Sequence, residues 1–136
     1  MKKNYIWIIG VIIVIGVVGF YQYSNSGDKK PKIEVTPVFY DFGNIPYKKV
    51  EHNFSVKNKG GGVLEITRIS TSCGCTKGAI DKELISSGET SNLLVSIDPN
   101  LMEENIEGKI ERIVYIKSND PDNPEIEIEL RANVVR

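Results

Sequence analysis

Hydrophobic and polar residues alternate along several stretches of the chain beyond residue 32. Alternation with a period of two is typical of a β-strand with one buried face. The clearest stretch lies at the C-terminus, where five apolar residues share one face: Ile126, Ile128, Leu130, Ala132 and Val134. The same pattern predicts further strands over residues 33–42, 50–57, 63–71, 93–98 and 109–118. Clusters of Gly, Asn, Asp, Ser and Pro separate these stretches, as expected of turns.

These strands predict an all-β fold for residues 33–136, an immunoglobulin-like antiparallel β-sandwich. A barrel is the alternative, because strand count alone does not separate the two architectures. Pro37 interrupts the first stretch, which suits a strand at the edge of a sheet. The residues that we expect in the core are Phe54, Ile66, Val95, Val114, Ile128 and Leu130.

A long hydrophobic segment precedes this domain. No charged residue lies between Tyr5 and Tyr23, and a helix of that length is about 28 Å long, close to the hydrocarbon thickness of a bilayer. Lys2 and Lys3 come before the segment, so the positive-inside rule places the N-terminus in the cytoplasm. We therefore expect residues 1–23 to form an uncleaved, single-span transmembrane helix. A cleaved signal peptide is the alternative, but it would have a shorter apolar region and a small-residue cleavage site.

Residues 24–32 are polar apart from Gly27 and Pro31, so they are predicted to be a tether. With the N-terminus inside, the domain that follows would be extracytoplasmic, in the periplasm or at the cell surface. Acidic residues outnumber basic ones in residues 33–136. A mildly acidic domain argues against nucleic acid, which favours a basic patch on one face.

Two cysteines, Cys73 and Cys75, flank Gly74, and the chain contains no others. In an oxidising compartment two thiols so close seldom stay reduced, so a disulfide without a bound metal is the leading interpretation. The two Cα atoms would be about 6.6 Å apart in an extended chain, at the upper edge of disulfide geometry. A turn would bring them closer, and Gly74 would allow dihedral angles that a side chain forbids. Closing so small a ring constrains little of the unfolded chain.

Three other interpretations of the cysteine pair stay open. Two thiolates could supply half of a zinc or copper site, with His52 or Met102 as a further ligand. His52 also fits a partly buried core position, because it has the same parity as Phe54. A thiol-redox pair would need an activating cation, and Lys77 is the only one nearby in the sequence. The cysteines could also simply pack into the edge of the sandwich.

The cysteines belong to a longer motif, Thr71–Thr76, with the sequence TSCGCT. Shorter pieces accompany it at Phe42-Gly43, Asn58-Lys59-Gly60 and Ser118-Asn119-Asp120. Together these features resemble the domain of unknown function 1573 family over about residues 37–134. The resemblance implies an immunoglobulin-like domain of a secreted or membrane-attached bacterial protein. It implies no activity, because the role of that family is not established.

Catalytic motifs do not accompany these features. The chain has one histidine and no Gly-x-Ser-x-Gly motif, and the glycines at 60–62 lack the Lys-Ser/Thr of a phosphate loop. We therefore expect neither enzymatic activity nor a cofactor. The predicted function is a membrane-anchored extracytoplasmic module that is structural or binds a protein through exposed strand edges. The alternative is a metal-binding or thiol-redox protein that uses Cys73 and Cys75.

Overall fold

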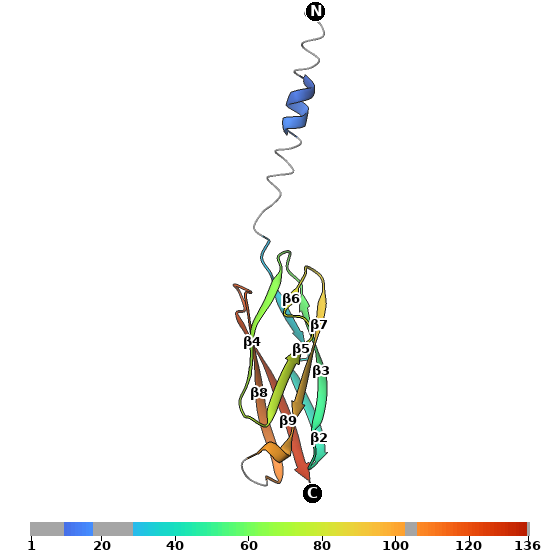
Figure 1. The fold of residues 1–136 in the computed structure, drawn as a ribbon, viewed down its shortest axis with the longest axis vertical. Helices are drawn as coiled ribbons and strands as arrows, with labels where there is room; N and C mark the ends of the chain where they lie inside the picture. The colour runs from blue at the N-terminus through green and yellow to red at the C-terminus, as the bar shows by residue number, and fades with distance from the viewer. Residues whose placement is uncertain (1–9, 18–28, 103–105, 136) are drawn as a thin grey trace, which may run out of the picture.

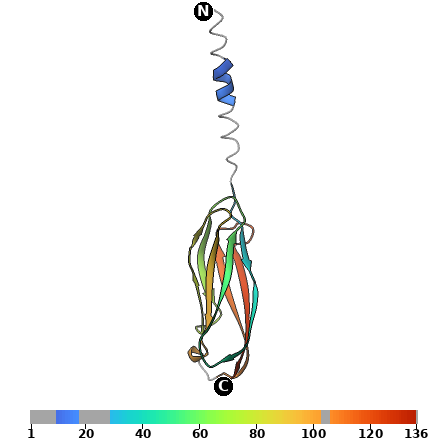
Figure 2. The same ribbon diagram turned by 90° about the vertical axis from the view of Figure 1, so that its right-hand side faces the viewer.

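The described part of the domain contains nine strands and one short helix (Figures 1 and 2). The computed structural model describes residues 10–17, 29–102 and 106–135. The strands are β1 (Ile33–Thr36), β2 (Phe39–Pro46), β3 (Val50–Asn58), β4 (Leu64–Thr71), β5 (Thr76–Ile80), β6 (Leu84–Ile85), β7 (Thr90–Ile97), β8 (Gly108–Ser118) and β9 (Glu125–Val135). The 3-10 helix η1 (Pro99–Leu101) follows β7.

Two sheets form the layers of a sandwich, as the sequence predicts. One has four strands in the order β1-β3-β7-β5, and the other has five in the order β2-β9-β8-β4-β6. The prediction of purely antiparallel sheets is wrong at one pair, because β2 runs parallel to β9, with Phe39 opposite Glu129 and Ile45 opposite Val134. Alternation along a strand specifies which side chains face the core, but it carries no information about the direction of the neighbouring strand.

Pro37 separates two strands that belong to different sheets. β1 pairs with β3, whereas β2 pairs with β9. The peptide bond between Thr36 and Pro37 is cis. Proline has no N–H to donate to a β-ladder. The chain therefore passes from one sheet to the other at a residue where neither sheet needs a donor. The stretch 33–42 is therefore two strands, and each lies at the edge of its sheet, as Pro37 predicts.

The sequence does not predict β5 and β6. β6 has two residues, and β5 contains Gly78 and Ala79, which carry little strand propensity. Gly78 faces β4 so closely that a Cβ there would lie 2.8 Å from Cγ2 of Ile69. A small residue is therefore needed where β5 packs against β4. Because this residue has no side chain, β5 lacks the hydrophobic alternation by which a strand is predicted.

The core lies between the two sheets, at the positions predicted from alternation. All six predicted core residues are buried, and Ile66 is the most exposed of them at 4%. Ile45, Leu64, Ile85, Leu93, Ile97 and Ile116 extend the same cluster. The facing assigned to β3, β4, β7, β8 and β9 is confirmed.

Asn58, at the end of β3, joins three segments of the chain. It is fully buried, and its Oδ1 accepts hydrogen bonds from the backbone N–H groups of Lys32 (3.2 Å) and Gly60 (2.9 Å). Its Nδ2 donates to the carbonyl oxygens of Gly62 (2.7 Å) and Ile85 (2.9 Å). All the hydrogen-bonding capacity of the amide is used, and the chain entering β1, the glycine turn and β6 are held together.

The glycine turn approaches the backbone of residues 29–32 closely. The N–H of Lys59 donates to the carbonyl of Lys32 at 2.8 Å, and that of Gly61 donates to the carbonyl of Lys30 at 3.0 Å. A Cβ at Gly60 or Gly62 would overlap main-chain atoms of this segment. The last residues of the predicted tether are thus hydrogen-bonded to the domain.

Asp120, in the turn between β8 and β9, is a buried carboxylate that is 1% exposed. Its Oδ2 accepts the N–H of Ile33 (2.9 Å), and its Oδ1 accepts those of Asp122 (2.9 Å) and Asn123 (3.2 Å). Burial alone would raise the pKa of Asp120, but these donors outweigh burial and hold its pKa below the ordinary value of 3.8. The carboxylate ties the start of β1 to this turn.

Residues 10–17 of the N-terminal segment are helical. Over the described ranges, no helix has the length and apolar character needed to cross a bilayer. The predicted anchor (residues 1–23) and tether (residues 24–32) lie partly outside the described residues. Both stay predictions.

Candidate functional site

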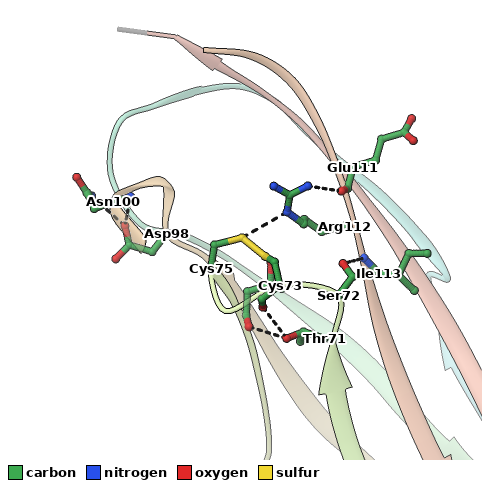
Figure 3. Close-up of a disulfide and its surroundings, with 10 residues drawn as sticks. Thr71, Ser72, Cys73, Cys75, Asp98, Asn100, Glu111, Arg112 and Ile113 are labelled. Carbon is green, nitrogen blue, oxygen red and sulfur yellow. Dashed lines mark hydrogen bonds between the residues drawn. A yellow bond between two sulfur atoms is a disulfide. The ribbon is translucent and has the colours of Figure 1, made fainter. Parts of the chain in front are cut away.

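The turn between β4 and β5 carries a disulfide between Cys73 and Cys75 (Figure 3). Their Cα atoms are 5.3 Å apart, within the usual range for disulfides. The turn brings the two Cα atoms closer together than they would be in an extended chain. The pairing favoured by the sequence is therefore present in the structure.

Hydroxyl groups just before the cysteines hold the turn in place. The Thr71 hydroxyl lies 2.9 Å from the carbonyl oxygens of both Cys73 and Thr76 and donates across the turn. Ser72 donates its N–H to the carbonyl of Ile113 (2.9 Å), and its Oγ accepts the N–H of Ile113 (3.0 Å). The turn is thus fixed against β8.

The two sulfur atoms have different surroundings. Cys75 is 3% exposed, and Arg112 of β8 donates from Nε to its Sγ at 3.3 Å (Figure 3). Arg112 also donates from Nη1 to the carbonyl of Glu111 at 2.7 Å, which orients the guanidinium. Cys73 is only half-buried, and its Sγ lies 3.4 Å from the Thr76 hydroxyl. Cys75 is covered and its sulfur faces a cation, whereas the half-buried Cys73 keeps part of its surface in contact with solvent.

An open pocket of about 720 Å³ adjoins the disulfide. It is lined by the turn 72–75 and Arg112, together with three apolar residues, Leu101, Met102 and Ile106. We call this the disulfide pocket. Leu101 is 53% exposed, so these apolar residues present a hydrophobic surface to solvent. The pocket therefore combines a disulfide, a guanidinium and an aliphatic wall.

The disulfide pocket lies near the end of the sandwich opposite to the start of β1. Thr76, the first residue of β5, pairs with Ile97, the last residue of β7. Ile33, the first residue of β1, pairs instead with Asn58, at the far end of β3. In Figure 1 the turn between β4 and β5 accordingly lies toward the C-terminal end of the domain, and β1 begins at the other end.

Gly74 does not have the role that the sequence suggests. In the described residues, positive φ angles occur at Gly43, Gly88 and Gly108, and not at Gly74. A Cβ at position 74 would meet no atom within 4 Å. The expectation of special dihedral angles is wrong, and position 74 has open space around it.

His52 lies outside the disulfide pocket, whereas Met102 lines it. The His52 ring stacks on Tyr40, with centroids 3.5 Å apart, and packs edge-on against Phe54 at 4.9 Å. His52 is half-buried, so the interpretation as a core histidine is confirmed. Within the described part of the chain, no three His, Cys, Asp or Glu side chains come together as a metal-ligand group.

Sequence reasoning missed Arg112. Lys77 is the cation next to the cysteines in sequence, but the sulfur is approached by Arg112, which lies 37 residues from Cys75. On β8, Arg112 has the same parity as the buried residues Ile110 and Val114, so a half-buried charge takes a position on the core-facing side of the strand. That break in the pattern is the signal that could have identified it, because charged residues are seldom buried without a partner.

One family model, described as a protein of unknown function (DUF1573), matches residues 21–134. The chain belongs to this family. The resemblance to this family, predicted from the sequence, is thereby confirmed. Membership of DUF1573 assigns no activity. No curated protein matches the chain.

Solved structures similar to this DUF1573 chain share its fold. A protein of unknown function from Porphyromonas gingivalis W83 aligns with a TM-score of 0.70 at 22% identity, covering 76% of this chain and 46% of that one. The VesB protease of Vibrio cholerae gives a TM-score of 0.61 at 13% identity, with coverage of 74% and 31%. A PapD-like domain of human CEP192 also gives 0.61, at 11% identity, with coverage of 79% and 87%. The chain thus spans less than half of the first two proteins.

Proposed function

We propose that this DUF1573 domain is an extracytoplasmic interaction module, anchored by residues 1–23, that docks a protein partner at the disulfide pocket. The observation that carries the proposal is the accessible disulfide beside an exposed aliphatic wall. We propose no enzymatic turnover for it. Binding and at most stoichiometric chemistry at the pocket are what the described residues support.

The oxidised cysteine pair supports an extracytoplasmic location. Disulfides persist in oxidising compartments and are rare in the cytosol. The hydrophobic segment before the domain and the lysines at its start support the same orientation. An anchor that precedes β1 would leave the disulfide pocket at the end of the domain remote from the membrane.

The strand edges offer less room for a partner than the pocket does. The edge strands β1, β5 and β6 span four, five and two residues. β2 is longer, but its register shifts between Asp41 and Asn44, beside the positive φ of Gly43. Short or irregular edges discourage pairing with another chain. Docking at the pocket is therefore preferred here to docking along an edge.

A photo-cross-linking amino acid placed at Leu101 or at Leu84 tests docking at the pocket. Both side chains are exposed, at 53% and 62%, but Leu84 lies on β6, outside the disulfide pocket. Irradiation of intact cells should give a discrete cross-linked protein from position 101 and none from position 84. Equal cross-linking at the two positions, or none at position 101, would contradict the proposal.

A further inference from the structure

The two cysteines of the disulfide differ in their surroundings. Arg112 donates to Sγ of Cys75 at 3.3 Å, and Cys75 is 3% exposed, whereas Cys73 is half-buried and lines the pocket. A nucleophile arriving from solvent therefore meets Cys73 first. Sulfur accepts hydrogen bonds only weakly when neutral, so the guanidinium gains most when Cys75 becomes a thiolate.

Arg112 is well placed to stabilise a thiolate at Cys75. Its position on β8 lies opposite Leu130 of β9 and between buried residues of its own strand. A cation lowers the pKa of an adjacent thiol, and a thiol with a lower pKa leaves faster in disulfide exchange. The position of the charge thus selects which sulfur departs.

We infer that Cys73 accepts a thiolate from a cysteine of a protein partner, and that Cys75 is the leaving group stabilised by Arg112. The partner's thiolate attacks Sγ of Cys73 as the bond between the two Sγ atoms breaks. The bonding pair goes to Cys75, which becomes a thiolate beside the guanidinium. The product is a mixed disulfide between Cys73 and the partner, and no other oxidant is consumed.

The mixed disulfide can react in two ways. Cys75 can attack Cys73 again, which restores the original bond and releases the partner's thiolate. A second thiolate of the partner can instead attack the partner's own sulfur, which oxidises the partner to a disulfide and leaves Cys73 and Cys75 reduced. The domain acts in either case as a stoichiometric acceptor.

The aliphatic wall points to a cysteine within a protein rather than to a small thiol. Leu101, Met102 and Ile106 line the pocket together with the disulfide. Apolar residues beside the partner's cysteine would bury surface there as its sulfur reaches Cys73. The open space around Gly74, where a Cβ would meet nothing within 4 Å, leaves the approach clear.

The test uses the purified full chain in detergent and three thiol probes. The probes are a cysteine peptide with leucine neighbours, the same peptide with glutamate neighbours, and glutathione. Reactions are quenched in acid, the released thiol is alkylated, and mass spectrometry of peptides locates the probe. We expect the probe on Cys73 and the alkyl group on Cys75, with the leucine peptide reacting fastest.

Arg112 is tested as a positioning residue through rate and regiochemistry together. Arg112→Gln should slow exchange by about 3- to 10-fold, because the leaving thiolate loses its cation. Arg112→Lys, which retains the charge, should recover part of that rate. Arg131→Gln is the matched control, because Arg131 is an exposed arginine of the same sheet that pairs with Glu111 and Glu129. Thermal unfolding of each variant reports on the fold.

Attachment of the probe mainly to Cys75, or equally to both cysteines, would refute the inference. So would an Arg112→Gln variant that folds normally and reacts at the rate of the Arg131→Gln control. Equal exchange rates for the three probes would refute the part of the inference that names a protein, rather than a small thiol, as the partner. The inference rests on the proposed docking at the pocket, but exchange is measured on the purified chain. Its failure is therefore distinguishable from failure of the cross-link at Leu101.

Discussion

Replacing Asn58 with alanine is expected to lower the free energy of unfolding by about 3–5 kcal/mol. The change removes four hydrogen bonds from a fully buried amide. The carbonyl of Ile85 would lose its buried donor, and the N–H of Gly60 would lose its acceptor. A buried polar group without a partner costs about 1–3 kcal/mol, so these losses dominate the effect. Urea unfolding monitored by circular dichroism measures it.

Asn53→Ala is the matched control for Asn58→Ala. Asn53 lies on the same strand and is exposed, so its loss should change stability by less than about 0.5 kcal/mol. Asn58→Asp should also be strongly destabilising, because a carboxylate cannot donate to the carbonyls of Gly62 and Ile85. A cost for Asn58→Ala close to that of the control would show that Asn58 does not organise this end of the sandwich.

Asp120→Asn is expected to cost about 2–3 kcal/mol at neutral pH. The amide keeps the shape of the carboxylate but has a single acceptor oxygen. With that oxygen facing Asp122 and Asn123, the new NH₂ group would oppose the N–H of Ile33. Asp122→Asn, at an exposed position in the same turn, is the control and should stay within about 0.5 kcal/mol of the unchanged chain.

The effect of Asp120 should depend on pH in a defined direction. Its pKa in the folded chain is below 3.8, so its contribution to stability is fully present above that value and is lost as the pH falls through the folded pKa. The difference in unfolding free energy between the unchanged chain and Asp120→Asn should therefore shrink below about pH 4. A difference that stays constant from pH 7 to pH 2.5 would contradict the assignment of a charged, hydrogen-bonded Asp120.

Strands with unbroken alternation could be predicted from the sequence, and they supply the core. β9, with Ile128 and Leu130 facing inward, is the clearest case. β5 escaped prediction because Gly78 is required by close packing against Ile69. The parallel pairing of β2 with β9 is set by the crossing at Pro37, and local periodicity does not encode such long-range choices.

The candidate site could be predicted only in part, for the same reason. Cys73 and Cys75 are adjacent in the sequence, so their pairing follows from proximity and compartment. Arg112 reaches Cys75 through the packing of β8 against the motif, a contact between distant parts of the chain. Asn58 likewise resembles a turn residue in the sequence, and its partners are visible only in the folded chain.

Labelling of the cysteines in intact spheroplasts tests the central claim most directly. Cys73 and Cys75 are the only cysteines, so all label on the chain reports on this pair. With a membrane-impermeant maleimide, we predict no label without reductant and clear label after a membrane-impermeant reductant, in both cases without lysis. The double variant Cys73→Ser and Cys75→Ser should stay unlabelled throughout. Label that appears without reductant, or only after lysis, would contradict an oxidised disulfide pocket on the outer side of the membrane.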